Sequence, residues 1–185
     1  LFKEKVLTDL AMRNACYFGV LLFSLSLGLI SCAEKKEMLR PPKSIGAWVV
    51  YWDGDRGLQE LESYGSLFDR VSLFAYELDK EGLPQAAPGL ERLISSFLRL
   101  AEAKGFSPWA TLVNDWREEE KVFLKETVKL RDILADKERR GRQVAAIVER
   151  VAGAGFSGLD LDYEGFSSQD KAVLDPLISE LASAL

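Results

Sequence analysis

The sequence predicts an α/β protein built on a parallel β-sheet, and three observations support this. Strand-like and helix-like segments alternate four times between residues 45 and 185. The fourth strand-like segment, at residues 158–164, carries three carboxylates between glycine-rich turns. Aromatic and acidic residues also gather where the predicted strands end. Such alternation gives a parallel sheet that is either doubly wound or closed as a barrel. Because no glycine-rich phosphate loop follows the first strand, nucleotide binding is disfavoured.

The first half of this region contains three predicted strands and two predicted helices. Compact apolar runs predict strands at residues 45–52, 70–78 and 108–113. A weak helix is expected between about residues 57 and 67. Apolar residues at i, i+3, i+4 and i+7 predict a clear helix over residues 88–104, which the following glycine ends. Trp48, inside the first strand, is interpreted as a core residue.

The second half contains a long charged connection, two helices and the acidic strand. Residues 118–134 have helical tendency and are expected to lie over the rim of the sheet. A helix is predicted over residues 137–152 from the apolar residues on one face. After the acidic strand, Ser167 and Ser168 suit the N-cap of a last helix. The alternative is a later start with Pro176 in the first turn, where proline is tolerated.

The composition excludes several kinds of site. The 185 residues include no histidine, which excludes a Ser-His-Asp triad, a Cys-His pair and a histidine metal site within them. The net charge of −5 argues against a nucleic-acid partner, and the basic run from Lys137 through Arg140 to Arg142 is interpreted as the solvent side of a helix. The two cysteines, Cys16 and Cys32, provide no disulfide framework for the folded part. Carboxylate chemistry remains.

The N-terminal segment is interpreted as an export signal. Arg13 precedes an apolar run over residues 15–30 that is short for a membrane span, and Met12 is interpreted as the natural start. The run ends in Leu29-Ile30-Ser31-Cys32, which resembles the lipobox of bacterial lipoproteins. That resemblance implies cleavage before Cys32 and a lipid on its sulfur. The domains expected are a signal over 1–31, the lipidated cysteine with a polar tether over 32–44, and a folded region over 45–185.

The expected location follows from this signal. An ordinary secretory signal with a chance cysteine is the alternative to the lipobox. With either signal the protein leaves the cytoplasm. A lipid on Cys32 would hold it at a bacterial membrane, in the periplasm or at the cell surface.

Asp160, Asp162 and Glu164 form a row on one face of the predicted fourth strand. Side chains alternate across a strand, so the apolar residues between them face the other way. Three like charges on a protected face do not all ionise cheaply, and at least one pKa is expected to be raised. A carboxyl group that keeps its proton near neutral pH suits a general acid. The plainer alternatives are a solvated face of an antiparallel sheet and a divalent-metal site.

Polar and aromatic residues at the strand ends predict a sugar-binding site. In a (β/α)8 barrel the C-terminal strand ends form the active site, and aromatic faces beside carboxylates resemble a site where pyranose rings stack. Each aromatic residue taken alone fits core packing, but the collective pattern favours binding. The expected substrate-binding residues are Tyr51, Trp52, Tyr76, Asn114, Trp116 and Tyr163.

The segment Ser157-Gly158-Leu159-Asp160-Leu161-Asp162-Tyr163-Glu164 resembles the fourth-strand signature of glycoside hydrolase family 18, the chitinase family, which reads D-x-x-D-x-D-x-E. The resemblance covers about residues 45–185. It implies a (β/α)8 TIM barrel, of which about the first four βα units are present. It further implies hydrolysis of β-1,4 glycosidic bonds in N-acetylated polysaccharide, either chitin-like or peptidoglycan.

The same resemblance implies a role for each carboxylate. Glu164 would be the general acid, and Asp162 would hold the substrate's N-acetyl group, whose carbonyl oxygen attacks the anomeric carbon in a substrate-assisted retaining reaction. Asp160 would pair with Asp162 and tune it. No metal or cofactor is implied. Ser157 replaces the family's first aspartate; it is expected to hydrogen-bond Asp160 and to weaken the tuning without abolishing activity.

The length of the chain limits this expectation. Removal of the signal would leave 185 − 31 = 154 residues, whereas such a barrel needs about 250. The chain is therefore expected to be the N-terminal half of a catalytic domain, inactive by itself. The alternatives are a non-catalytic carbohydrate-binding relative, an inactive truncated gene product, and a Mg²⁺ or Mn²⁺ site for phosphoryl chemistry. The retained Glu164 argues against the first of these, and the missing phosphate loop against the last.

Overall fold

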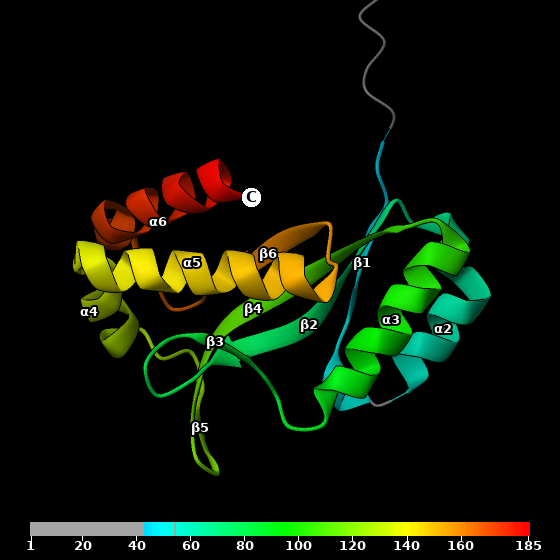
Figure 1. Ribbon diagram of the computed structural model, residues 1–185, viewed down its shortest axis with the longest axis horizontal. Helices are drawn as coiled ribbons and strands as arrows, with labels where there is room; N and C mark the ends of the chain where they lie inside the picture. The colour runs from blue at the N-terminus through cyan, green and yellow to red at the C-terminus, as the bar shows by residue number, and fades with distance from the viewer. Residues whose placement is uncertain (1–42, 54) are drawn as a thin grey trace, which may run out of the picture. The chain divides into compact units, whose positions relative to one another are not determined.

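Four parallel strands form the centre of the fold. The computed structural model describes residues 43–53 and 55–185 (Figure 1). The four strands lie side by side in chain order and each neighbouring pair is parallel. This is the arrangement of the first half of a (β/α)8 barrel, so the predicted fold class is confirmed. The strands are β1 (Gly46–Val49), β2 (Arg70–Leu78), β4 (Ser107–Glu118) and β6 (Gly158–Asp162).

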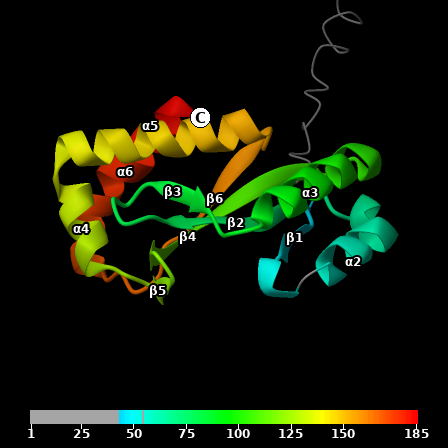
Figure 2. The same ribbon diagram turned by 60° about the horizontal axis from the view of Figure 1, so that its bottom comes forward.

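Helices connect the parallel strands and bury their apolar faces. After the short 3-10 helix η1 (Tyr51–Asp53), α2 (Arg56–Tyr64) and η2 (Gly65–Leu67) lead into β2. The helix α3 (Leu90–Lys104) follows β2 and ends at the predicted glycine, Gly105, which adopts a left-handed conformation with φ +80°. The helix α5 (Lys137–Ala154) lies along the sheet (Figure 2). Within the described ranges, no helix is long and apolar enough to cross a membrane.

The segment between β4 and α5 differs from the predicted helical connection. β4 continues to Glu118 and turns back through two residues into β5 (Lys121–Phe123), which pairs with it in antiparallel fashion. Glu119 has a positive φ of 54°, as a tight hairpin turn requires. Helix is confined to α4 (Val128–Ala135). A second short strand, β3 (Pro84–Ala86), pairs antiparallel with β2.

The basic run of α5 is only partly on the solvent side. Arg140 is 8% exposed, and its guanidinium donates to Glu180 at 2.8–3.1 Å and to the carbonyl oxygen of Leu134 at 2.7 Å. Arginine suits such a position because its planar fork satisfies several acceptors at once. The interpretation of Arg140 as a solvated residue is therefore wrong.

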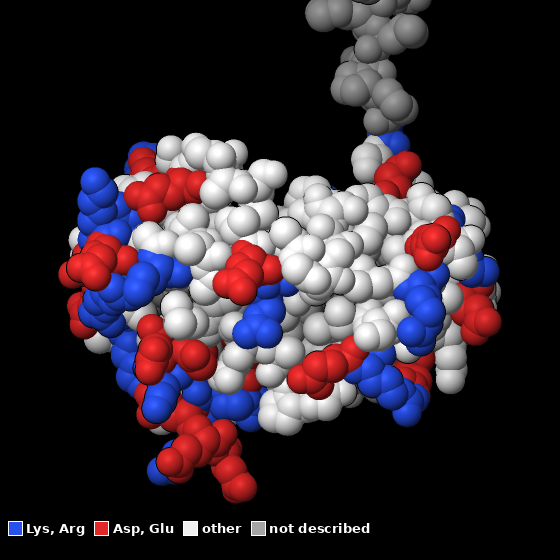
Figure 3. All heavy atoms as spheres, in the orientation of Figure 1, with Lys and Arg blue, Asp and Glu red and all other residues white. Residues whose placement is uncertain are grey.

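On the face seen in Figure 3, charged side chains gather most densely over the end formed by α4, α5 and β5.

The last helix begins close to the predicted cap and well before Pro176. Ser167 and Asp170 form a capping box around the short 3-10 helix η3 (Ser168–Asp170), and α6 (Lys171–Ala184) follows it directly. Ser167 is thus confirmed as a cap. Pro176 lies inside α6 and not in its first turn, because the helix already begins at Lys171.

The predicted signal segment, with Met12 as its start and Cys32 as its lipidation site, lies outside the described residues.

Candidate active site

The row of acidic residues lies at the carboxyl-terminal end of β6. Asp160 and Asp162 belong to the strand, and Glu164 follows its end by two residues. Leu159 and Leu161, which alternate with the two aspartates, pack against the core. The alternation predicted from the sequence is therefore present, because side chains on a strand point to opposite faces in turn.

Asp160 is held by one side chain from β1, at the far end of the row of parallel strands, and one from the neighbouring strand β4. Its Oδ2 accepts hydrogen bonds from Trp48 Nε1 at 2.7 Å and from Thr111 Oγ1 at 3.1 Å. Trp48 is 65% exposed, so its interpretation as a core residue is wrong. The register explains this, because Trp48 lies on the sheet face that carries Asp160 and not on the helix-covered face. The expected partner Ser157 instead donates its backbone N–H to Pro108 O at 2.7 Å.

Asp162 is the carboxyl group of the row whose pKa is raised. Burial is the largest cause, followed by the negative charges of Glu164 and Asp160. The ammonium group of Lys125 acts in the opposite direction. The expectation that the crowded row raises at least one pKa is thus met at Asp162, on which Asp160 acts through its charge.

We expect Asp162→Asn to become more stable relative to the parent protein as the pH rises from 3 towards neutrality. A carboxyl whose folded pKa lies above its ordinary value of 3.8 contributes stability that is present below that value and is lost as the pH rises through the folded pKa. Asparagine does not ionise and avoids this loss. Urea unfolding at a series of pH values measures the difference.

Asp170→Asn is the control of opposite sign. The bond from Arg131, followed by the bond from the Ser167 backbone, lowers the pKa of Asp170. Its contribution to stability is therefore present at neutral pH and lost as the pH falls. Parallel pH dependences for the Asp162 and Asp170 variants would contradict the assignment.

Asn114 fixes the backbone of Glu164 against the end of β4. The side chain is 1% exposed; its Nδ2 donates to Glu164 O at 2.9 Å, and its Oδ1 accepts from Glu164 N at 2.9 Å. Asn114 borders the cleft, as a substrate-binding residue should. Because both functional groups of the amide are bonded to Glu164, the structure gives Asn114 a positioning role.

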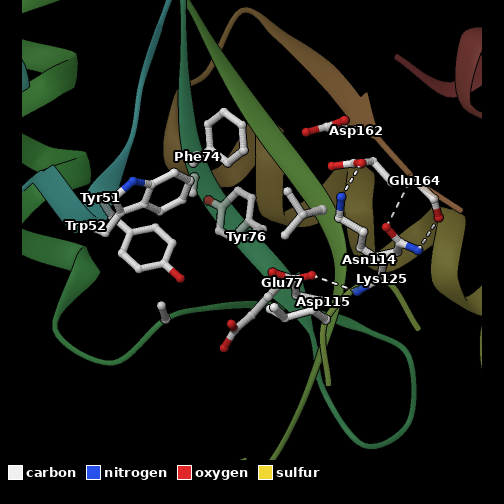
Figure 4. Close-up of a pocket in the computed structure, with 14 residues that line it drawn as sticks. Tyr51, Trp52, Phe74, Tyr76, Glu77, Asn114, Asp115, Lys125, Asp162 and Glu164 are labelled. Atoms are coloured by element: carbon white, nitrogen blue, oxygen red, sulfur yellow. Dashed lines mark hydrogen bonds and ion pairs between the residues drawn. The ribbon is translucent and has the colours of Figure 1, made fainter. Parts of the chain in front are cut away.

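The side chains of Asp162 and Glu164 face a cleft of about 420 Å³. Figure 4 shows Tyr51 and Trp52, from η1, on one side of the cleft and Asp162 and Glu164 on the other. Tyr51 and Trp52 meet edge to face at 5.2 Å between ring centroids, and Trp52 meets Phe74 at 5.5 Å. Trp52 is 65% exposed, so its indole is free to meet a ligand. Two of the predicted binding residues therefore form an aromatic wall opposite the acidic row.

Tyr76 borders the same cleft, but its side chain is used elsewhere. The ring packs on Phe156 at 6.2 Å, and the hydroxyl donates to Arg150 O at 3.4 Å. The register between β2 and β4 shifts between Phe74 and Tyr76. A shift of one residue turns the following side chains to the other face of the sheet. Tyr76 consequently packs towards α5.

Two further predicted binding residues lie outside the cleft. Trp116 is 2% exposed, and Lys129 Nζ lies 5.2 Å from its ring centroid. Tyr163 stacks on Phe166 at 6.4 Å, and burial raises the pKa of its hydroxyl. Neither side chain lines the cleft. The strand pattern explains Tyr163, which alternates with the acidic row and so faces away from it.

Three charged residues of the cleft region were not predicted. Glu77 lines the cleft at 4% exposure and accepts from Arg117 Nη2 at 3.1 Å and from Arg117 Nε. Lys125 lines it as well and forms an ion pair with Glu164. Glu77 could have been found as the last polar residue of the second predicted strand. Arg117 and Lys125 fell near or within the connection predicted to be helical, so nothing marked them.

Acidic side chains that lie close together can also form a metal site. In residues 43–53 and 55–185, no three histidine, cysteine, aspartate or glutamate side chains are grouped so that they could hold a metal ion.

Solved structures with a similar fold include chitinases and a spore cortex-lytic enzyme. A class V chitinase from Pseudomonas fluorescens Pf-5 matches with a TM-score of 0.65 and 19% identity, over 77% of this chain and 42% of its own. A family 18 chitinase from Cycas revoluta in complex with (GlcNAc)3 matches with a TM-score of 0.60 and 19% identity, over 77% and 40%. The spore cortex-lytic enzyme SleL from Bacillus cereus matches with a TM-score of 0.61 and 12% identity, over 77% and 32%.

No known family profile and no curated protein matches the sequence. The described chain nevertheless has the chitinase-like fold of glycoside hydrolase family 18 over about three quarters of its length. It spans less than half the length of each solved structure named above.

Proposed function

We propose that this chain carries the catalytic carboxylates of a glycosidase that hydrolyses β-1,4 bonds in polysaccharides containing N-acetylglucosamine. One observation carries the proposal. Asp160, Asp162 and Glu164 stand in a row at the end of the fourth parallel strand of a chitinase-like fold, and the last two face an aromatic wall across a cleft. Strand ends at this edge are where (β/α)8 enzymes place their catalytic groups.

The reaction we propose is substrate-assisted and retains configuration at the anomeric carbon. Glu164 gives a proton to the glycosidic oxygen as the bond from that oxygen to the anomeric carbon breaks. The carbonyl oxygen of the substrate's own N-acetyl group attacks the anomeric carbon, and Asp162 orients that group and stabilises the positive oxazolinium. Water then attacks the anomeric carbon and opens the oxazolinium ring. A proton of this water passes to Glu164, which regains its acid form. Asp160, held by Trp48 and Thr111, acts on Asp162 through its charge.

The aromatic wall supports a sugar as the ligand. Exposed indole and phenol faces stack well on the apolar face of a pyranose ring, and Trp52 and Tyr51 are the cleft residues that offer them. Both chitin-like polymers and peptidoglycan contain N-acetylglucosamine and remain within the proposal. The solved structures with this fold include chitinases and a spore cortex-lytic enzyme.

Binding and product analysis with N-acetylglucosamine oligomers test the proposal. We expect the tetramer to quench tryptophan fluorescence through Trp52 and, in the complete gene product, to be cleaved with the β-anomer appearing first by proton NMR. An α-anomer appearing first would exclude substrate assistance. Binding without cleavage by the complete product would favour a carbohydrate-binding relative, and absence of both would overturn the sugar site.

We also propose that the protein is exported and lipid-anchored through Cys32. The lipobox-like run at residues 29–32 supports this. In a bacterial host, Cys32→Ala should move the protein from the membrane fraction to the soluble fraction; an unchanged distribution would contradict the anchor.

A further inference from the structure

A lysine side chain of the cleft, Lys125, forms an ion pair with Glu164. Lys125, from the loop after β5, donates through Nζ to Glu164 Oε2, and the two side chains remain 53% and 50% exposed. Figure 4 shows both residues on the side of the cleft opposite the aromatic wall. The ammonium group therefore hydrogen-bonds to the carboxyl group that donates the proton in the proposed reaction.

The backbone around Lys125 is fixed in this place. Lys125 has a positive φ of 54°, a left-handed conformation that is unfavourable for a residue with a side chain. Two hydrogen bonds hold the loop: Lys125 N donates to Asp115 Oδ1 at 2.9 Å, and Glu126 N donates to Asn114 O at 2.9 Å. Because Asn114 also clamps Glu164, the same end of β4 positions both members of the ion pair.

A second ion pair in the cleft differs in burial. The pair of Glu77 and Arg117 has side-chain exposures of 5% and 21%, and separating it would leave a buried charge without a partner. The pair of Lys125 and Glu164 is half exposed, so water can replace each partner at little cost. The ion pair of Lys125 and Glu164 is therefore the one that can open.

The groups around Lys125 are all acidic. Glu164 follows β6, Asp162 lies in β6 and Asp115 lies in β4; all three raise the pKa of Lys125, with the hydrogen bond to Glu164 as the largest cause. The ammonium group of Lys125 is therefore attracted to this acidic end of the cleft, and Glu164 is its hydrogen-bonded partner there.

We propose that Lys125 is a removable cap on Glu164 that a sugar must displace before the carboxyl group can reach a glycosidic oxygen. The inference rests on the proposed role of Glu164. Lys125 thus competes with the sugar for Glu164 and lowers the affinity of the site for sugar.

Sugar binding to Lys125→Met tests the cap, with Lys171→Met as the matched control. Lys171 forms an exposed ion pair with Asp175 on α6 and does not line the cleft. We expect Lys125→Met to bind the N-acetylglucosamine tetramer roughly two- to fivefold more tightly, the factor that an exposed ion pair is worth. The control should bind like the parent protein. Weaker or unchanged binding by Lys125→Met would overturn the cap.

Salt and a double mutant separate a cap from a structural role. Sodium chloride screens the ion pair, so binding of this uncharged sugar by the parent protein should tighten with salt, while Lys125→Met should respond little. In a Glu164→Gln background, Lys125→Met should give no further gain. Equal salt responses of the parent and Lys125→Met would contradict the cap.

A measurement without sugar distinguishes failure of the cap from failure of the proposed function. In an NMR titration of the lysine side chains, Lys125 should lose its proton at a higher pH in the parent protein than in Glu164→Gln. Equal values would show that the pair does not form in solution. If the pair forms but neither the parent nor Lys125→Met binds the tetramer, the proposed function fails, and the pair is structural and not a cap.

Discussion

Glu164→Gln is expected to lower the hydrolysis of N-acetylglucosamine oligomers about 10²- to 10⁴-fold, the range that a general acid contributes. Glutamine has the same shape but carries no acidic proton to give to the leaving oxygen. The backbone of residue 164 is held by Asn114, and the substitution leaves those two hydrogen bonds in place. Binding should therefore survive. Initial rates of tetramer cleavage, measured beside tetramer affinity on the complete gene product, check this.

Glu118→Gln is the matched control for this substitution. Glu118 is also a half-exposed glutamate paired with a lysine, Lys129, but it lies on the β4–β5 hairpin outside the cleft. Its replacement removes an ion pair of the same kind and should leave the rate unchanged. If Glu164→Gln cleaved at the parent rate, the proton would have to come from another group, and the assignment of the acid would be wrong.

Asn114→Ala is expected to reduce both stability and activity. The substitution removes the partners of two backbone groups of Glu164 in a place where Asn114 itself is 1% exposed. Leaving a buried polar group unsatisfied costs about 1–3 kcal/mol, so the loss expected for the two groups is roughly 2–6 kcal/mol. The loop that carries Lys125 bonds the backbone oxygen of Asn114, and this hydrogen bond remains in Asn114→Ala. Urea denaturation and tetramer cleavage measure the two effects.

Gln143→Ala provides a control of similar burial. Gln143 is fully buried in α5, and its Nε2 donates to Gly82 O at 2.7 Å, away from the cleft. Its loss should reduce stability without changing the affinity for sugar. Asn114→Asp adds a second comparison, because it keeps an acceptor for Glu164 N but removes the donor to Glu164 O. Parent-like activity in Asn114→Asp would show that the clamp does not position the acid.

The local pattern of the chain predicted the parts of the fold that depend on neighbours in sequence. Four parallel strands, the helix α3 with its terminal glycine and the cap at Ser167 follow from periodicity and capping residues within a few positions. The acidic row of β6 follows from simple alternation along one strand. Such features need no knowledge of distant residues.

The hairpin of β4 and β5 was missed because its stability comes from pairing across the turn. The charged sequence from residue 118 onward has helical tendency, but Val122 and Phe123 find partners on β4. Strand preference depends on such neighbours more than helix preference does. With the hairpin missed, Lys125 could not be connected with Glu164, which lies 39 positions further along the chain.

The order of the strands along the chain, the row Asp160, Asp162 and Glu164, and the aromatic pair after β1 can all be predicted from the amino-acid sequence, because each depends on residues close together in the chain. Which side chains enter the cleft depends on contacts between distant elements. A register shift turned Tyr76 towards α5, and the open sheet face exposed Trp48 to bond Asp160. The physical reason is that register, strand pairing and ion pairs join residues that are far apart in the chain, and these contacts form only when the strands assemble.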